Sequence, residues 1–130
     1  MPAMNSFLLV AAGGAIGASL RHGAGLLSVR HLPANWPWAT FSVNLLGGFA
    51  MGLAAGWFAY KGAEGGNDLR LFLATGVLGG FTTFSAFSLE TMNMLRSGEA
   101  GKALAYAALS VILSVAALGL GLWVARRAFA

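Results

Sequence analysis

The side chains that could do chemistry in this chain are polar residues inside long apolar stretches. Thr40 and Asn44 lie four positions apart in one stretch, and Tyr106, Ser110 and Ser114 follow the same spacing in another. Residues four apart share one face of a helix, and polar groups within a membrane are costly, so they mark functional sites. The spacing therefore indicates two polar stripes that could line one track.

Single hydroxyls also have a structural interpretation. Serine and threonine in membrane helices often bond to the carbonyl four residues earlier, and we favour that interpretation for Ser110. Asn44 is the stronger candidate, because an amide has four hydrogen-bonding sites to satisfy. Arg21 either snorkels to the interface or lies at the mouth of an anion pathway, and we interpret His22 as a packed or interfacial histidine. Glu90 is expected to pair with a basic residue.

The stretch 69–94 is interrupted near its middle by Gly79-Gly80 and then by Thr82-Thr83. These residues weaken a helix, and a break at this depth requires the freed carbonyls to be buried in protein or to meet water or an ion. Carbonyl oxygens suit cations such as Na⁺. A close helix crossing without an ion explains the same residues, so both interpretations stay open here.

Phe81, Phe84 and Phe87 recur every three residues just after these glycines. Such a stripe usually faces lipid or packs against another helix. An aromatic ring also has a positive edge, so rings turned edge-on would favour an anion without a full charge. Conduction requires binding weak enough for release, which such edges would provide.

Composition places these residues in a membrane. Of 130 residues, 58% are hydrophobic and 9% are charged, whereas soluble domains carry about 25% charged residues. The absence of cysteine excludes disulfides and thiolate metal sites. No nucleophile, base and orienting group occur together, which argues against an enzyme, and no nucleotide-binding loop is present. The basic residues between apolar stretches are better explained by lipid headgroups than by nucleic acid.

Four stretches are long enough to span a membrane, and the sequence predicts an all-α protein with a single domain over residues 1–130. The expected helices cover residues 6–29, 38–60, 69–94 and 103–124. The first is expected to be a retained helix, because no Lys or Arg precedes Arg21 as a signal peptide would require. Glycines four apart, such as Gly13 with Gly17, predict close helix packing and an oligomer.

The basic residues are nearly balanced between the two membrane sides. With both termini on one side, Lys61, Arg70, Arg126 and Arg127 share that side, and Arg30, Arg96, Lys102 and on one interpretation Arg21 share the other. The positive-inside rule therefore gives almost no orientation. Insertion in both orientations with antiparallel pairing is one explanation, and chance in a short chain is the other.

The motif Gly79-Gly80-Phe81-Thr82-Thr83-Phe84-Ser85-Ala86-Phe87-Ser88 resembles the signature of the Fluc (CrcB) fluoride channels. Gly13-Gly14 followed by Arg21 and the stretch Thr40-Phe41-Ser42-Val43-Asn44-Leu45-Leu46-Gly47 match that family too, in order and along the whole chain. The resemblance implies a multi-pass protein of the bacterial inner membrane that exports fluoride passively as an antiparallel homodimer, with a broken third helix.

The resemblance also implies roles for individual residues. Carbonyls of Gly79 and Thr82 would hold a structural Na⁺ at the dimer centre. Phe84 and Phe87 would present ring edges along the fluoride pathway. The polar groups of that pathway would be Asn44, Thr40, Tyr106, Ser110 and Ser114, with Arg21 in the vestibule.

One position departs from the family pattern, and two other functions remain open. Many members have Ser-Thr between the two phenylalanines, where this chain has Ser85-Ala86 and lacks the second hydroxyl. A proton-coupled exporter would need an embedded carboxylate, for which Glu90 is the only candidate. A membrane assembly subunit without transport would explain the glycines but not Asn44 or the interrupted third stretch.

Overall fold

The computed structural model describes residues 2–62 and 66–130 of the chain, and within these ranges four helical spans are long and apolar enough to cross a membrane. α1 (Pro2–His31), α2 (Trp38–Lys61) and α6 (Ala100–Phe129) are single long helices. The third span, Gly66–Arg96, is a bent path of several joined elements. The predicted all-helical membrane architecture is confirmed.

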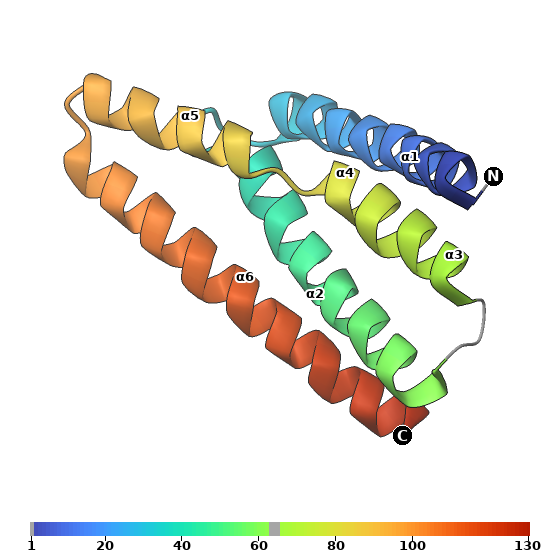
Figure 1. Ribbon diagram of the computed structural model, residues 1–130. Coiled ribbons are helices and arrows are strands. Elements are labelled where there is room, and N and C mark those ends of the chain that lie inside the picture. Colours follow the sequence, from blue (N-terminus) through green and yellow to red (C-terminus); the bar gives the residue numbers. More distant parts are fainter. Residues whose placement is uncertain (1, 63–65) are drawn as a thin grey trace.

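The third span consists of four elements in series. They are α3 (Gly66–Arg70), the π-helical stretch η1 (Leu71–Leu78), α4 (Gly79–Phe81) and α5 (Phe84–Arg96). Thr82 and Thr83, between α4 and α5, have extended backbone with ψ values of 158° and 122°. Figure 1 shows that the span turns at this point, so that α5 lies along a different line from α4.

The four spans pack as two pairs. α2 lies against α6, and α1 lies beside η1 and α4 (Figure 1). α5 joins the pairs by extending from the end of α4 toward the start of α6 (Figure 1). The extended residues therefore lie where the two pairs meet.

Glycine allows the close approach of α1 to the third span. A Cβ atom on Gly13 would run into the carbonyl oxygen of Phe72, and one on Gly17 would run into that of Val77. The backbone of Gly14 also lies against Gly80, but a Cβ built on Gly14 itself has nothing within 4 Å. The predicted packing role of Gly13 and Gly17 is confirmed.

Glycines also allow the close approach of α2 to α6. A Cβ atom on Gly52 would run into the carbonyl oxygen of Leu118, and one on Gly121 would run into that of Phe49. A Cβ on Gly48 would lie 2.8 Å from the carbonyl oxygen of Ser114. This contact brings the face of α2 that carries Asn44 close to the face of α6 that carries Ser114, because residues four apart share a helix face.

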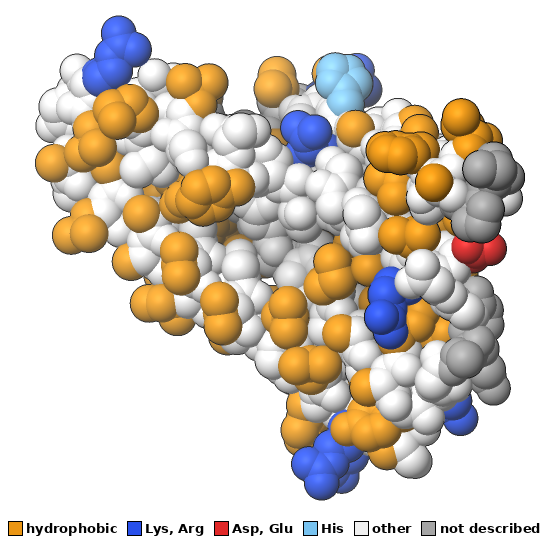
Figure 2. Space-filling view, viewed as in Figure 1, with side chains coloured by type: hydrophobic (Ala, Val, Ile, Leu, Met, Phe, Trp, Pro, Cys, Tyr) orange, Lys and Arg blue, Asp and Glu red, His pale blue; other side chains and the backbone are white. Residues whose placement is uncertain are grey.

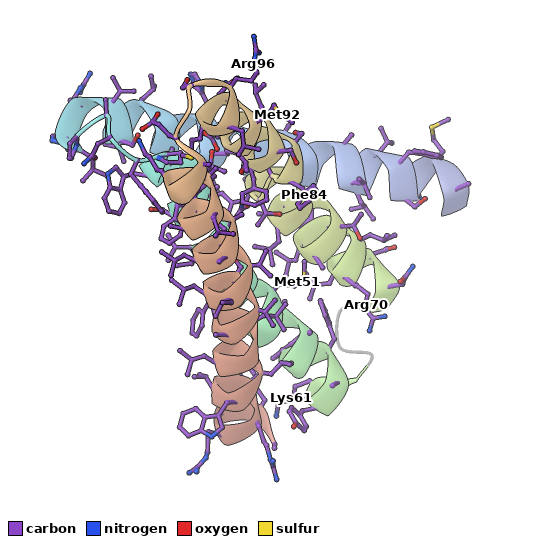
Figure 3. All side chains as sticks on the ribbon, turned by 90° about the vertical axis from the view of Figure 1, so that its left-hand side faces the viewer. Met51, Lys61, Arg70, Phe84, Met92 and Arg96 are labelled. Carbon is purple, nitrogen blue, oxygen red and sulfur yellow. The ribbon has the colours of Figure 1, made fainter. Side chains whose placement is uncertain are left out.

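The outer surface is apolar, as a lipid-facing surface must be. Phe7 is 74% exposed, Val29 is 85% exposed and Leu104 is 72% exposed. Hydrophobic side chains cover much of the face in Figure 2, and Lys and Arg side chains lie mostly toward its ends. In Figure 3, Arg96 lies at one end of the molecule and Lys61 lies at the other.

Candidate functional site

The site is organised by a paired hydrogen bond between Asn44 and the backbone of Thr83. The Asn44 side-chain nitrogen donates to the Thr83 carbonyl at 3.0 Å, and the Thr83 N–H donates to the Asn44 side-chain oxygen at 2.8 Å. The amide of α2 thus replaces the backbone partners that a continuous helix would give Thr83. This explains how two extended residues are satisfied at membrane depth.

The Thr83 hydroxyl caps the start of α5. The Thr83 hydroxyl accepts a hydrogen bond from the Ala86 N–H at 3.2 Å, in the manner of a helix N-cap. The Thr82 hydroxyl donates to the Leu78 carbonyl of its own helix at 3.0 Å. The two adjacent threonines therefore have different roles. The Thr83 hydroxyl caps the N-terminus of α5, and the Thr82 hydroxyl bonds to the last turn of the preceding helix.

Two carbonyls lose their ordinary helical donors through these contacts. In a continuous helix the Thr83 N–H would bond the Gly79 carbonyl, and the Ala86 N–H would bond the Thr82 carbonyl. Both N–H groups are engaged elsewhere, by Asn44 and by the Thr83 hydroxyl. Gly79 is exposed on the surface of the molecule, so its carbonyl is available to a partner from outside the chain.

A pocket of about 390 Å³ lies beside the extended residues, between α2, α5 and α6. The predicted site residues that line it are Asn44, Thr82, Phe84, Phe87, Ser110 and Ser114. None of the residues that line the pocket carries a charge. Figure 2 shows this face hollowed near its middle, and Figure 3 places two lining residues, Phe84 and Met51, midway between the ends.

The serine hydroxyls of this pocket are not bonded to their own helix. Ser110 and Ser114 have buried hydroxyl oxygens without a hydrogen-bond partner in the described part of the chain. The expectation that Ser110 bonds the carbonyl four residues earlier is wrong. Both hydroxyls line the pocket, where they can donate to a guest without first giving up an internal bond.

The phenylalanine stripe divides between two surfaces. Phe84 and Phe87 line the pocket with ring centroids 5.5 Å apart, whereas Phe81 faces a hollow along α1. Phe84 is 76% exposed, and the Phe87 ring centroid lies 5.2 Å from that of Tyr106. The period of three is therefore not a single stripe, because the extended residues interrupt the helix within it.

Glu90 forms hydrogen bonds with two hydroxyl groups rather than an ion pair. Its two carboxylate oxygens accept from the Thr40 hydroxyl at 2.9 Å and from the Tyr106 hydroxyl at 2.8 Å. The expected pairing of Glu90 with a basic residue is wrong. The ion pair found among the described residues joins Lys102 and Glu99 on α6 and the turn before it, at 3.7 Å.

Thr40 and Tyr106 are thus held away from the pocket between α2, α5 and α6, although they belong to the predicted stripes. Tyr106 is fully buried and lies between Phe87 and Glu90. Glu90 itself lines a separate hollow near the start of α6. The two stripes therefore meet, but Tyr106 and Glu90 separate the pocket from the hollow beyond.

Arg21 lies on the other side of the extended residues. Its Nε donates to the Gly80 carbonyl at 3.1 Å, and it lines a hollow of about 320 Å³ with Thr40 and Thr83. Thr83 lines both this hollow and the pocket between α2, α5 and α6. Arg21 therefore does not extend to the membrane interface and does not line the pocket. It lies in the neighbouring hollow, which meets the pocket at Thr83.

Sequence reasoning missed two members of this arrangement. Thr83 was treated only as a helix-weakening residue, although it touches both hollows and holds Asn44. Glu90 was not placed in the site, although an acid inside an apolar span is a functional signal in itself. That signal was available, but the partners of Glu90 lie 50 and 16 residues away.

The four apolar spans make the chain a multi-pass membrane protein, and the uncharged, donor-lined pocket between its second, third and fourth spans suits the passage of a small solute. The chain belongs to the family described as CrcB-like protein, Camphor Resistance (CrcB), whose model matches residues 8–122.

Relatives of the chain carry a more specific description. A protein of Hyphomonas neptunium named fluoride-specific ion channel FluC is 68% identical over 127 residues, which are 98% of this chain and all of that protein. Proteins of the same name from Caulobacter vibrioides and Phenylobacterium zucineum are 50% and 52% identical, with the same coverage of both chains.

Proposed function

We propose that this chain is a fluoride-selective channel of the bacterial inner membrane, and not an enzyme. The observation that carries the proposal is the pocket that gathers Asn44, the rings of Phe84 and Phe87, and the unpaired hydroxyls of Ser110 and Ser114. The names of relatives up to 68% identical over nearly the whole chain support the same function.

The chemistry of the pocket suits an anion that must leave again. Hydroxyls without internal partners donate hydrogen bonds to a guest, and positive ring edges add weak attraction. A fixed positive charge would hold an anion too tightly for conduction, and none of the residues that line the pocket has one. Fluoride enters a cell as uncharged HF and dissociates there, so a passive pathway driven by the membrane potential empties the cell of it.

The pathway runs, in our proposal, from the Arg21 hollow past Thr83 and Asn44 into the pocket, along Ser114 and Ser110. Tyr106, with Thr40 behind it, closes the far end of the pocket. Arg21 attracts the anion from solution and is held in place by the Gly80 carbonyl. Asn44 receives the anion where the two hollows meet at Thr83.

The working unit in this proposal is an antiparallel homodimer. Phe84 is 76% exposed although it lines the pocket, so one chain alone leaves the pocket open on that side. Gly79 presents a carbonyl that has lost its helical donor on an exposed surface at mid-span. Lipid cannot satisfy such a group, whereas a second copy can cover it.

A structural Na⁺ fits the same region. The carbonyls of Gly79 and Thr82 are among those whose helical donors are diverted, and carbonyl oxygens are suitable ligands for this hard cation. The Thr82 hydroxyl is occupied by the Leu78 carbonyl, so the backbone would hold the ion. In this proposal the ion joins the third spans of two copies and supplies positive charge at the dimer centre.

Fluoride efflux from liposomes that contain the purified protein tests the function. A fluoride electrode should record fast release, and a chloride electrode under the same gradient should record almost none. Equal release of both ions would contradict selectivity. A folded protein that releases neither ion would contradict the channel and favour a membrane assembly subunit.

A further inference from the structure

The Arg21 hollow contains a second basic side chain that the proposed pathway does not use. His22 follows Arg21 on α1, is exposed, and lines the same hollow of about 320 Å³ with Thr40, Thr83 and Ala86. The exposure of His22 rules out the packed alternative, and its interfacial position stays a prediction. Its imidazole instead borders the space next to the threshold of the pocket.

The two basic residues of this hollow differ in how their charge depends on pH. Arg21 donates to the Gly80 carbonyl and keeps its charge at every pH a cell meets. A histidine side chain changes its charge between about pH 5 and 8. One hollow thus pairs a permanent positive charge with a side chain that adds a second one as the pH falls.

We propose that His22 is a titratable anion-attracting residue of the vestibule, which raises the entry of fluoride when it is protonated. The inference rests on the proposed channel function and extends it. It gives the channel more throughput in acid, where more HF enters the cell and the export demand is greater.

The surroundings of His22 leave its charge effective. Arg21 is the other charged residue lining the hollow. η1 and α4 contain no charged residue, and the one charge of α2 is Lys61 at its far end. α5 borders the hollow through Ala86 and carries Glu90 and Arg96; Glu90 bonds Tyr106 and Thr40, which also lines the hollow, rather than a basic residue.

The test is electrical, because HF crosses lipid without carrying current. Fluoride currents through the reconstituted protein are measured at the same pH on both sides, from pH 8 to pH 5.5, at low ionic strength. A unit charge about 8 Å from the anion path in a water-like medium contributes about a twofold change in occupancy, and salt screens it. The wild-type current should therefore rise about twofold toward acid and less in high salt.

His31 gives a matched control, because it is the other histidine of the chain and lies at the exposed end of α1 outside this hollow. The His22→Gln variant should lose the rise, and His31→Gln should keep it. The His22→Lys variant should hold the acid-level current at every pH. Size-exclusion chromatography of each variant shows that it is folded.

The outcomes separate this inference from the function on which it rests. A wild-type current that does not change with pH, or a rise that survives in His22→Gln, would overturn the role of His22 and leave the channel intact. The absence of fluoride current in every variant at every pH would overturn the channel itself.

Discussion

At the scale of single residues, the rings of Phe84 and Phe87 are expected to contribute through their edges rather than their bulk. The Phe84→Ile and Phe87→Ile variants keep apolar volume but lose the positive edge. We expect each to lower fluoride efflux about tenfold, which corresponds to ~1.4 kcal/mol, while the protein stays folded.

Phe81 provides the control for this experiment. It belongs to the same sequence pattern but faces the hollow along α1 instead of the pocket. Phe81→Ile should therefore keep most of the fluoride efflux. Normal efflux in both Phe84→Ile and Phe87→Ile would count against the ring-edge mechanism.

Asn44 is expected to be needed for the structure of the extended segment as well as for transport. Asn44→Ala leaves the Thr83 N–H and carbonyl without their partners, and unsatisfied buried groups cost about 1 to 3 kcal/mol each. The variant should melt at a lower temperature in detergent and lose fluoride efflux. Asn93→Ala, at an exposed position of α5, should change neither, and an unchanged melting temperature in Asn44→Ala would contradict the structural role.

The candidate site residues could be selected from the sequence, but their partners could not. Asn44 stands out because its amide needs several hydrogen bonds, yet its partner Thr83 is 39 positions away. Ser110 was assigned a bond within its own helix because that partner is visible in sequence, and the structure shows an unpaired hydroxyl instead. Tertiary contacts decided both cases.

At the scale of elements, the glycine face of α1 sets how closely α1 approaches the third span. In Gly17→Ala the new Cβ would meet the Val77 carbonyl and lie 2.7 Å from the Phe81 nitrogen. Backbone atoms cannot move aside cheaply, so we expect a loss of about 1 to 3 kcal/mol in unfolding free energy.

The neighbouring Gly14 makes this comparison specific. A Cβ built on Gly14 has nothing within 4 Å, so Gly14→Ala should be close to neutral or slightly stabilising, since alanine favours the helix. Thermal unfolding of both variants in the same detergent measures the difference. Equal melting temperatures would mean that α1 does not pack as described.

The spans were predictable because hydropathy and length suffice to recognise them, and residues 6–29 and 103–124 do lie within α1 and α6. The inner division of the third span was not predictable in detail. Gly79-Gly80 and Thr82-Thr83 indicated a weak point, but the π-helical winding of η1 depends on hydrogen-bond register, which hydropathy does not report.

At the scale of the whole molecule, a substitution at Gly79 tests the assembly of two chains without disturbing the fold of one. A Cβ on Gly79 has the Ala74 carbonyl as its nearest neighbour, at 3.6 Å, an ordinary contact. Gly79→Leu should therefore leave the single chain folded. If Gly79 lies at a dimer centre, the same variant should separate the dimer and reduce fluoride efflux strongly.

Thr82→Ala is the companion variant. Its hydroxyl bonds the Leu78 carbonyl of its own helix, so an ion held by backbone carbonyls should tolerate its loss. We expect a nearly wild-type dimer and efflux, measured by size-exclusion chromatography with light scattering and by the fluoride electrode. A Thr82→Ala defect as severe as that of Gly79→Leu would instead implicate the hydroxyl in binding the ion.

The orientation of the chain in the membrane can be tested directly because the chain contains no cysteine. Asn35 lies between α1 and α2, and Asn67 lies on α3 near the opposite end of the spans; both are exposed. An antiparallel dimer requires each position to face both sides of the membrane equally. A membrane-impermeant thiol reagent added to intact cells should therefore label about half of Asn35→Cys and half of Asn67→Cys.

Neither substitution changes a charge, so the near balance of basic residues that motivates the experiment is preserved. Labelling of one variant almost completely and of the other almost not at all would show a single orientation, and the antiparallel dimer would be wrong. Half-labelling of both would connect charge balance in the sequence to the assembly. Chains of both orientations would then be available to pair, and Gly79 and Phe84, exposed in one chain, are the surface on which we expect the oppositely inserted copy to lie.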